Sequence, residues 1–189
     1  MKQALLVIDV QQGFDEYARR VGGRNNLGAE ANIARVLAAF RWAQKPVIHV
    51  HHASLEADSP LRADAPGYAV KPEAVPIEGE RVIVKHVNSA FIGTDLEAVL
   101  HEDSITDLVI VGATTDHCCS TTARMAANLG FSVQYVEDAL WTLDKFGADG
   151  QRYAAQLVHD VNIASLNDEF VEVMSTDRVI ANLRAGGTP

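Results

Sequence analysis

The stretch Leu5-Leu6-Val7-Ile8-Asp9 near the start of the chain is a run of four apolar residues that ends at a carboxylate. A second run of this kind, Leu108-Val109-Ile110-Val111, leads into Gly112 in the second half of the chain. Neither run alternates apolar and polar residues, so each is expected to form a strand that is covered on both faces. Such strands are typical of a parallel sheet with helices on each side, which predicts the α/β class.

The rest of the chain alternates short apolar runs with longer helical stretches. This order predicts a three-layer, doubly wound, Rossmann-like fold with a six-stranded, mainly parallel sheet. Residues 1–189 are expected to form a single domain, because this length suffices for one α/β domain and is short for two. The expected strands are Ala4–Val10, Pro46–His51, Arg81–His86, Asp107–Val111, Ser132–Val136 and Glu169–Met174, and the expected helices are Asn26–Gln44, Thr94–His101, Cys118–Leu129, Arg152–Leu166 and Thr176–Leu183.

Local signals place some boundaries and leave two segments open. Thr94-Asp95-Leu96-Glu97 has the form of a capping box, and Ser175 is expected to cap the last helix. Residues 53–79 and 141–150 show no helix or strand pattern. Long loops in compact domains often form binding walls, so these two segments are candidate walls of a site.

Composition excludes several partners. The chain carries 16 basic and 25 acidic residues, a net charge of −9, which gives nucleic acid or an anionic membrane little to bind. No apolar run approaches the roughly 20 residues that cross a bilayer, and no cleavage site follows the first apolar run. The two cysteines, Cys118 and Cys119, are neighbours and cannot close a loop, so a reducing, cytoplasmic location is expected.

Three chemically complementary groups lie at predicted strand ends. Asp9 ends the first strand, Lys85 lies at the end of the third, and Cys118 follows the fourth. Ligands of open α/β sheets bind beyond the carboxyl ends of the strands, so an acid, an ammonium and a thiol are expected on one edge. Each residue alone has an ordinary structural explanation; the three together favour a catalytic site.

Cys118 is the candidate nucleophile. It lies where a loop turns into a helix, and the partial positive charge of a helix start favours a thiolate. Lys85 is expected to lower the pKa of this thiol further, while Asp9 can accept its proton and return it. Cys119 is one step round the helix and is expected to pack as a small hydrophobic residue.

These segments resemble the isochorismatase-like cysteine hydrolase superfamily, which includes nicotinamidases and carbamoylsarcosine amidohydrolases. The resemblance covers nearly the whole chain, and the segments are specific in combination, whereas each is weak alone. The matching segments are Ala4–Gln11, Lys85 with Asn88–Phe91 and Gly93–Leu96, Gly112–Cys118 with Thr121–Ala123, Val136–Ala139, and a helical histidine at His159.

The resemblance implies an Asp9–Lys85–Cys118 triad that attacks the C–N bond of a small amide or ureide through a Cys118 thioester. It implies an oxyanion hole from the backbone N–H groups of Thr114 and Cys118, and a cis Ala113–Thr114 peptide bond. It also implies assembly into dimers or tetramers. Four further positions are expected at the substrate: Gln11, Phe14, Ala113 and His117.

Departures from the family pattern concern the metal and the pocket entrance. Gln12-Gly13 replaces the usual Asn-Asp. Metal-dependent nicotinamidases carry Asp-x-His after the second strand, whereas this chain has His49-Val50-His51-His52 without the aspartate. On a strand, His49 and His51 share a face that His52 does not, so no metal and no other cofactor is expected.

Two other functions stay open at this point. Vinyl-ether hydrolysis of the isochorismate type would use Asp9 as a proton donor and would not need the thiol. A non-catalytic binding protein could keep the same fold. A papain-like pair is disfavoured because His117 is adjacent to Cys118, and a nucleotide-binding protein is disfavoured because neither Gly-x-Gly-x-x-Gly nor a Walker motif occurs.

Overall fold

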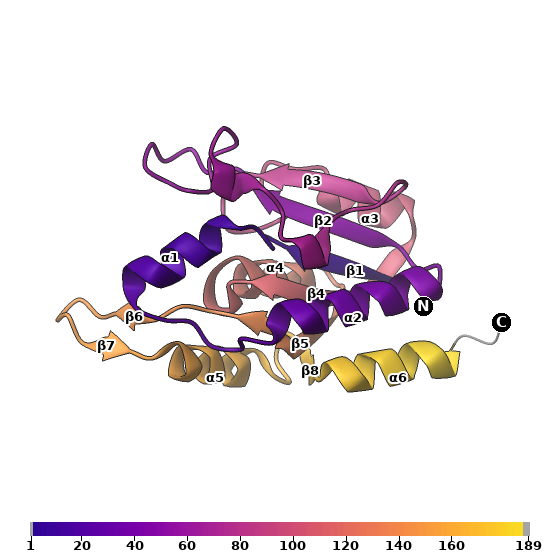
Figure 1. The fold of residues 1–189 in the computed structure, drawn as a ribbon. Helices are drawn as coiled ribbons and strands as arrows, with labels where there is room; N and C mark the ends of the chain where they lie inside the picture. The colour runs from indigo at the N-terminus through magenta and orange to yellow at the C-terminus, as the bar shows by residue number, and fades with distance from the viewer. Residues whose placement is uncertain (1, 187–189) are drawn as a thin grey trace.

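The computed structural model describes residues 2–186 and contains one six-stranded sheet whose paired strands are all parallel. The strand order is β3-β2-β1-β4-β5-β8, so the chain moves outward from β1 in one direction and then returns to build the other half (Figure 1). The predicted α/β class and the doubly wound sheet are confirmed. The strands are β1 (Lys2–Ile8), β2 (Val47–His52), β3 (Arg81–Lys85), β4 (Ile105–Ala113), β5 (Ser132–Trp141) and β8 (Glu172–Met174).

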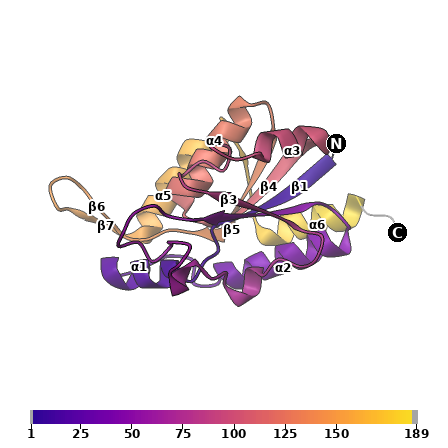
Figure 2. The ribbon, with the colours of Figure 1, turned by 90° about the horizontal axis from the view of Figure 1, so that it is seen from above.

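Helices cover both faces of the sheet (Figure 2). The first strand shows why: Leu5 and Val7 enter one buried cluster, whereas Leu6 and Ile8 enter the other. A strand buried on both sides requires apolar residues at every position, as the sequence has. One layer consists of α1 (Gly13–Val21), α2 (Ala29–Trp42) and α6 (Thr176–Gly186), and the other consists of α3 (Leu96–Glu102), α4 (Ser120–Asn128) and α5 (Ala155–Leu166).

Helix α1 was not predicted. It is a short helix with Asp15 and Glu16 in its first turn, Arg19 and Arg20 in its last, and a left-handed Gly22 after it. Charges of these signs at these ends are favourable to a helix, and a left-handed glycine commonly ends one. Phe14, Tyr17 and Val21 also stand at helical spacing on one face, so both the end signals and the apolar pattern were present in the sequence.

The segment 141–150 also differs from its prediction as an unstructured loop. It begins with the last residue of β5 and continues into a hairpin of β6 (Lys145–Phe146) and β7 (Arg152–Tyr153), which projects from the body (Figures 1 and 2). Helix α5 therefore begins at Ala155 and not at Arg152. The prediction failed because strands of two residues carry no readable period.

The predicted capping box is only half formed: Thr94 Oγ1 accepts the Leu96 N–H at 3.3 Å, but Glu97 does not reach back to the cap. Asp95 is the N-cap residue of α3, and the Thr94 hydroxyl donates to the Ala90 carbonyl at 2.6 Å. Glu97 instead lies 3.8 Å from His101, one turn along the helix. Ser175 does cap α6, because its Oγ accepts the backbone N–H of Arg178 at 3.3 Å. Within residues 2–186, no helix has the length and apolar character needed to cross a bilayer.

Candidate active site

Four neighbouring strands deliver polar side chains to one edge of the sheet. Asp9 directly follows β1, His52 ends β2, Lys85 ends β3, and the turn that carries Cys118 follows β4. The sheet reverses its direction of growth between β1 and β4. The site therefore lies at the topological switch point, where open α/β sheets bind their ligands.

The backbone beside the site is unusually close-packed. Asp9 adopts a left-handed φ of 52°, and its N–H donates to the Val50 carbonyl at 2.8 Å. Gly112 has a φ of 127°, and a Cβ added there would lie 1.9 Å from the Ile8 carbonyl oxygen. Only glycine lets β4 run this close to β1. The peptide bond between Ala113 and Thr114, just beyond this glycine, is cis.

The fully buried ammonium of Lys85 contacts both of the other catalytic candidates, Asp9 and Cys118. Lys85 Nζ lies 2.7 Å from Asp9 Oδ2 and 3.3 Å from Cys118 Sγ. It also lies 3.1 Å from His52 Nδ1, and Cys118 Sγ lies 3.7 Å from Asn88 Oδ1. Asp9 and Lys85 have no exposed side-chain surface. The structure thus brings together the three residues that the sequence placed at strand ends.

The electrostatics of the cluster correct one expectation. Burial raises the pKa of the Asp9 carboxyl, against the opposing effect of Lys85. Burial opposes the charge on Lys85, but the negative charge of Asp9 and the hydrogen bonds to Asp9 and Cys118 outweigh it and raise the pKa of Lys85. Burial, together with the negative charge of Asp9, raises the pKa of the Cys118 thiol. The resting group is therefore a thiol and not the expected thiolate, and it needs a base at the moment of attack.

Two buried hydrogen bonds fix the turn that carries the nucleophile. Thr115–Cys119 form a π-helical turn before α4, so Cys118 precedes the α-helix itself. Tyr135 on β5 donates its hydroxyl to the Thr115 carbonyl at 2.8 Å, and Thr115 Oγ1 lies 2.9 Å from His159 Nδ1 on α5. His159 is thus a buried histidine with a partner that anchors this turn. Cys119 is fully buried in the core, as expected.

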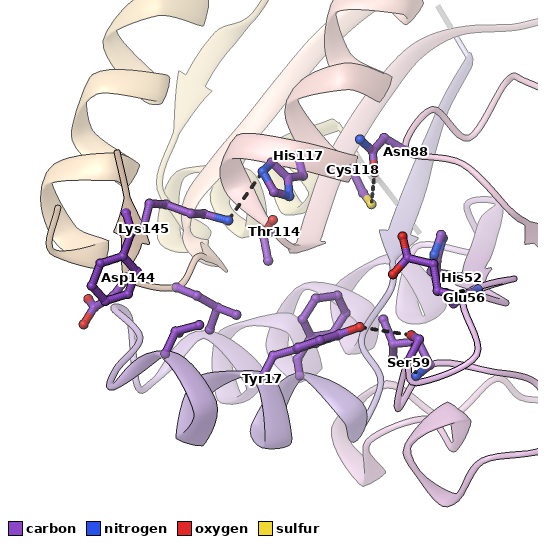
Figure 3. Close-up of a pocket in the computed structure, with 16 residues that line it drawn as sticks. Tyr17, His52, Glu56, Ser59, Asn88, Thr114, His117, Cys118, Asp144 and Lys145 are labelled. Atoms are coloured by element: carbon purple, nitrogen blue, oxygen red, sulfur yellow. Dashed lines mark hydrogen bonds between the residues drawn. The ribbon is translucent and has the colours of Figure 1, made fainter. Parts of the chain in front are cut away.

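The thiol opens onto a cavity of about 500 Å³. Thr114, Cys118 and the predicted His117 line it (Figure 3), and the predicted Phe14 lines it as well. Gln11 and Ala113 do not line it, which corrects their assignment to the substrate. Both are fully buried; the Gln11 amide donates to the carbonyls of His52 and Tyr68, and Ala113 packs in the core beneath α2.

The two segments predicted as candidate walls do line the cavity, the first with residues 54–61 and the second with residues 143–146. His52, Asn88 and Tyr17 also line it and were not assigned to the site from the sequence. Lys145 comes from the β6–β7 hairpin, and its Nζ lies 3.0 Å from Asp116 Oδ2 and 3.4 Å from His117 Nε2. Asp116 also accepts the Thr142 hydroxyl. The sequence marked the segment 141–150 as a candidate wall but did not single out Lys145, because its contact with Asp116 and His117 depends on the fold of the hairpin.

The histidine cluster on β2 divides between two faces. His49 Nε2 lies 2.8 Å from Glu80 Oε2, and the same carboxylate binds Arg41 of α2. The His51 ring packs edge-on against Tyr68, with no hydrogen-bond partner at its buried Nε2. His52 points the other way, to Lys85. Throughout residues 2–186, no three His, Cys, Asp or Glu side chains converge in a way that would hold a metal ion.

Comparison with known proteins agrees with this geometry. The Isochorismatase domain matches residues 3–178. The isochorismatase family protein YrdC of Bacillus subtilis is 40% identical over 95% of each chain. An isochorismatase-family protein from Chromobacterium violaceum has a crystal structure that superposes with a TM-score of 0.93, at 42% identity, over 97% of this chain and 94% of its own. A maleamate amidohydrolase of Pseudomonas putida is 25% identical over 97% of this chain and 87% of its own. This chain belongs to the isochorismatase family of hydrolases.

Proposed function

We propose that this chain hydrolyses the C–N bond of a small amide or ureide through a thioester on Cys118. The observation that carries the proposal is the ammonium of Lys85, which contacts both the Asp9 carboxylate and the Cys118 sulfur beside a cavity. A cavity of about 500 Å³ suits a small molecule. A relative named for amide hydrolysis agrees with the bond type.

Acylation begins from the neutral thiol. Sγ of Cys118 attacks the carbonyl carbon while Asp9 accepts the thiol proton, so no free thiolate has to exist in the buried site. The backbone N–H groups of Thr114 and Cys118 stabilise the oxyanion of the tetrahedral intermediate. Asp9 then returns the proton to the leaving nitrogen, the C–N bond breaks, and ammonia or an amine departs.

Deacylation uses the same base. Water attacks the thioester carbonyl and gives a proton to Asp9. The C–S bond then breaks, and the proton passes from Asp9 to the Cys118 sulfur, which restores the thiol and releases the acid. Lys85 keeps the charge of this cluster balanced in both halves, because it contacts both Asp9 and Cys118.

One observation favours a second function, the hydrolysis of a vinyl ether. Burial raises the pKa of Asp9, and a carboxyl with a raised pKa is a better proton donor at neutral pH. Such a reaction would use Asp9 as the acid and would leave Cys118 without a covalent role. The two functions therefore differ in what they require of the thiol.

The test is a screen of purified protein for ammonia release from amides and ureides, followed by intact-protein mass spectrometry. We expect turnover, a Cys118 acyl adduct, and loss of both in Cys118→Ala. Cys119→Ala is the matched control, since Cys119 is buried away from the cavity, and it should keep turnover. Full activity of Cys118→Ala on a vinyl ether, without activity on any amide, would replace the first function by the second.

A further inference from the structure

His52 occupies a position that the proposed reaction has not used. It is the last residue of β2 and pairs in register with Lys85 at the end of β3. Its ring lines the cavity, on the wall that also carries Glu56 (Figure 3). Its backbone is fixed by Gln11, whose Oε1 accepts the His52 N–H at 2.9 Å and whose Nε2 donates to the His52 carbonyl at 3.2 Å.

The contacts of Lys85 determine which ring nitrogen of His52 carries the proton. An ammonium has three N–H donors and no acceptor. Its three contacts are Asp9 Oδ2 at 2.7 Å, His52 Nδ1 at 3.1 Å and Cys118 Sγ at 3.3 Å. Since Lys85 can only donate, Nδ1 of His52 must accept, and the proton of the neutral ring lies on Nε2.

The ring is neutral under ordinary conditions. Burial, with a further contribution from the charge of Lys85, lowers the pKa of His52 to about 4. Within residues 2–186, no group forms a hydrogen bond with Nε2, while the ring itself borders the cavity. The ring therefore carries an N–H donor, with its tautomer set by Lys85, at the border of the space in which a substrate would bind.

We propose that His52 is a positioning residue with two roles: its Nδ1 directs the ammonium of Lys85 toward Asp9 and Cys118, and its Nε2–H donates to an acceptor atom of the substrate. The first role involves only the contacts among His52, Lys85, Asp9 and Cys118 and does not depend on a substrate. The second rests on the proposed amide or ureide hydrolysis, because it assigns the neutral ring to substrate orientation and not to proton transfer.

Three substitutions separate the two roles. The amide of His52→Asn lies near the position of Nδ1, so it keeps an acceptor for Lys85 and loses the donor at Nε2. The amide of His52→Gln lies near the position of Nε2 and loses the acceptor, and His52→Leu loses both groups. His101→Asn is the matched control, because His101 is an exposed histidine on α3 outside the site. Urea unfolding of each variant checks that the fold is kept.

The first measurement is the rate of Cys118 alkylation by iodoacetamide as a function of pH. Loss of the acceptor leaves a buried ammonium N–H unpaired, so Lys85 supports a developing thiolate less well. We expect alkylation at neutral pH to slow about tenfold in His52→Leu and His52→Gln, and to stay within about twofold of the parent in His52→Asn. A parent-like rate and pH profile in His52→Leu would overturn the positioning role.

Two further measurements address the donor. The ¹⁵N chemical shifts of the His52 ring should report a proton on Nε2, and a proton on Nδ1 would overturn the assignment. With an amide found in the screen, His52→Asn should raise KM about tenfold and change kcat little, because it removes one hydrogen bond to bound substrate. An unchanged KM in His52→Asn would refute the donor role. If no amide or ureide is turned over, the proposed function and the donor role fail together, whereas alkylation still decides the positioning role.

Discussion

At the residue scale, the buried pair of Asp9 and Lys85 governs the chemistry. Each charge is tolerated because the other lies 2.7 Å away, and removal of one partner leaves the other uncompensated in the interior. The negative charge of Asp9 also raises the pKa of Cys118. Asp9 thus suppresses the thiolate at rest and accepts the thiol proton during attack.

Asp9→Asn is therefore expected to change two rates in opposite directions. Without the negative charge, Lys85 acts alone on the thiol, the pKa of Cys118 falls, and alkylation at neutral pH becomes faster. Without the base, amide turnover falls by about 10²- to 10⁴-fold. Iodoacetamide kinetics and ammonia release measure the two effects. Glu102→Gln, an exposed change on α3, should leave both rates unchanged, and slower alkylation in Asp9→Asn would contradict this account.

The sequence predicted that Asp9, Lys85 and Cys118 lie together. The carboxyl ends of parallel strands meet at one edge of the sheet, however far apart these residues are along the chain. The sequence predicted neither His52 nor the neutral state of the thiol. His49, His51 and His52 look alike in the sequence, and only the alternation of β2 assigns His52 to the face of Lys85. The pKa of Cys118 depends on how deeply the turn is buried, which no local pattern states.

At the element scale, the contact between β1 and β4 depends on one glycine. Gly112 combines a φ of 127° with a gap too narrow for a Cβ. Gly79 offers a control, because its φ is 90° but nothing lies within 4 Å of its added Cβ. The two positions separate backbone strain from steric clash.

Gly112→Ala should lower the free energy of unfolding by about 3 kcal/mol or more, because strain and clash with Ile8 act together. Gly79→Ala should cost about 1 kcal/mol, the strain of a left-handed residue alone. Urea denaturation monitored by circular dichroism measures both. Equal costs at the two positions would show that β4 can move away from β1 without penalty.

The β6–β7 hairpin acts on the site through Lys145. Burial lowers the pKa of His117, the charge of Asp116 raises it, and the charge of Lys145 lowers it. Lys145→Met removes one lowering influence and leaves Asp116 in place, so the pKa of His117 should rise. A pH titration of His117 by NMR measures the shift, with Lys45→Met as the control. An unchanged or lower value would mean that Lys145 does not lie beside His117 in solution.

Helix α1 and the β6–β7 hairpin were not identified from the sequence. The helix had charges at its ends and an apolar face of helical period and could have been identified, whereas the hairpin had strands too short for any period. The long strands and helices were found because each buries an apolar face of the expected repeat. Their ends moved by a few residues, as at β8 and α5, because neighbouring turns decide where hydrogen bonding stops.

At the scale of the whole molecule, two half-buried carboxylates, Glu30 and Glu80, attach the long segment 53–80 to the body. Glu80 accepts hydrogen bonds from Arg41 and from the backbone N–H of Ile77, and it pairs with His49. Glu30 binds Arg24 and Lys71. Although burial opposes ionisation, these partners lower the pKa of each carboxyl from 4.5 to about 2.

A folded-state pKa below the unfolded value means that the fold favours the ionised form. The stability from Glu30 and Glu80 is therefore fully present above pH 4.5 and is lost as the pH falls toward 2. Urea unfolding at several pH values should show this decline, and it should be shallower in Glu30→Gln and Glu80→Gln. Glu102→Gln should keep the parent slope. A parent slope in both test variants would assign the acid loss to other groups.

The central place of β1 in the sheet has a consequence for synthesis on the ribosome. Leu5 pairs with Val47 on one side and with Val109 on the other, so one edge of this apolar strand waits for a partner made far later. At about 5 to 20 residues per second, the wait is roughly 5 to 20 s, during which the unpaired edge is open to aggregation. Nascent chains stalled before β4 leaves the ribosome should therefore be more protease-sensitive at β1 than chains stalled after it, and equal sensitivity would show that another segment protects this edge.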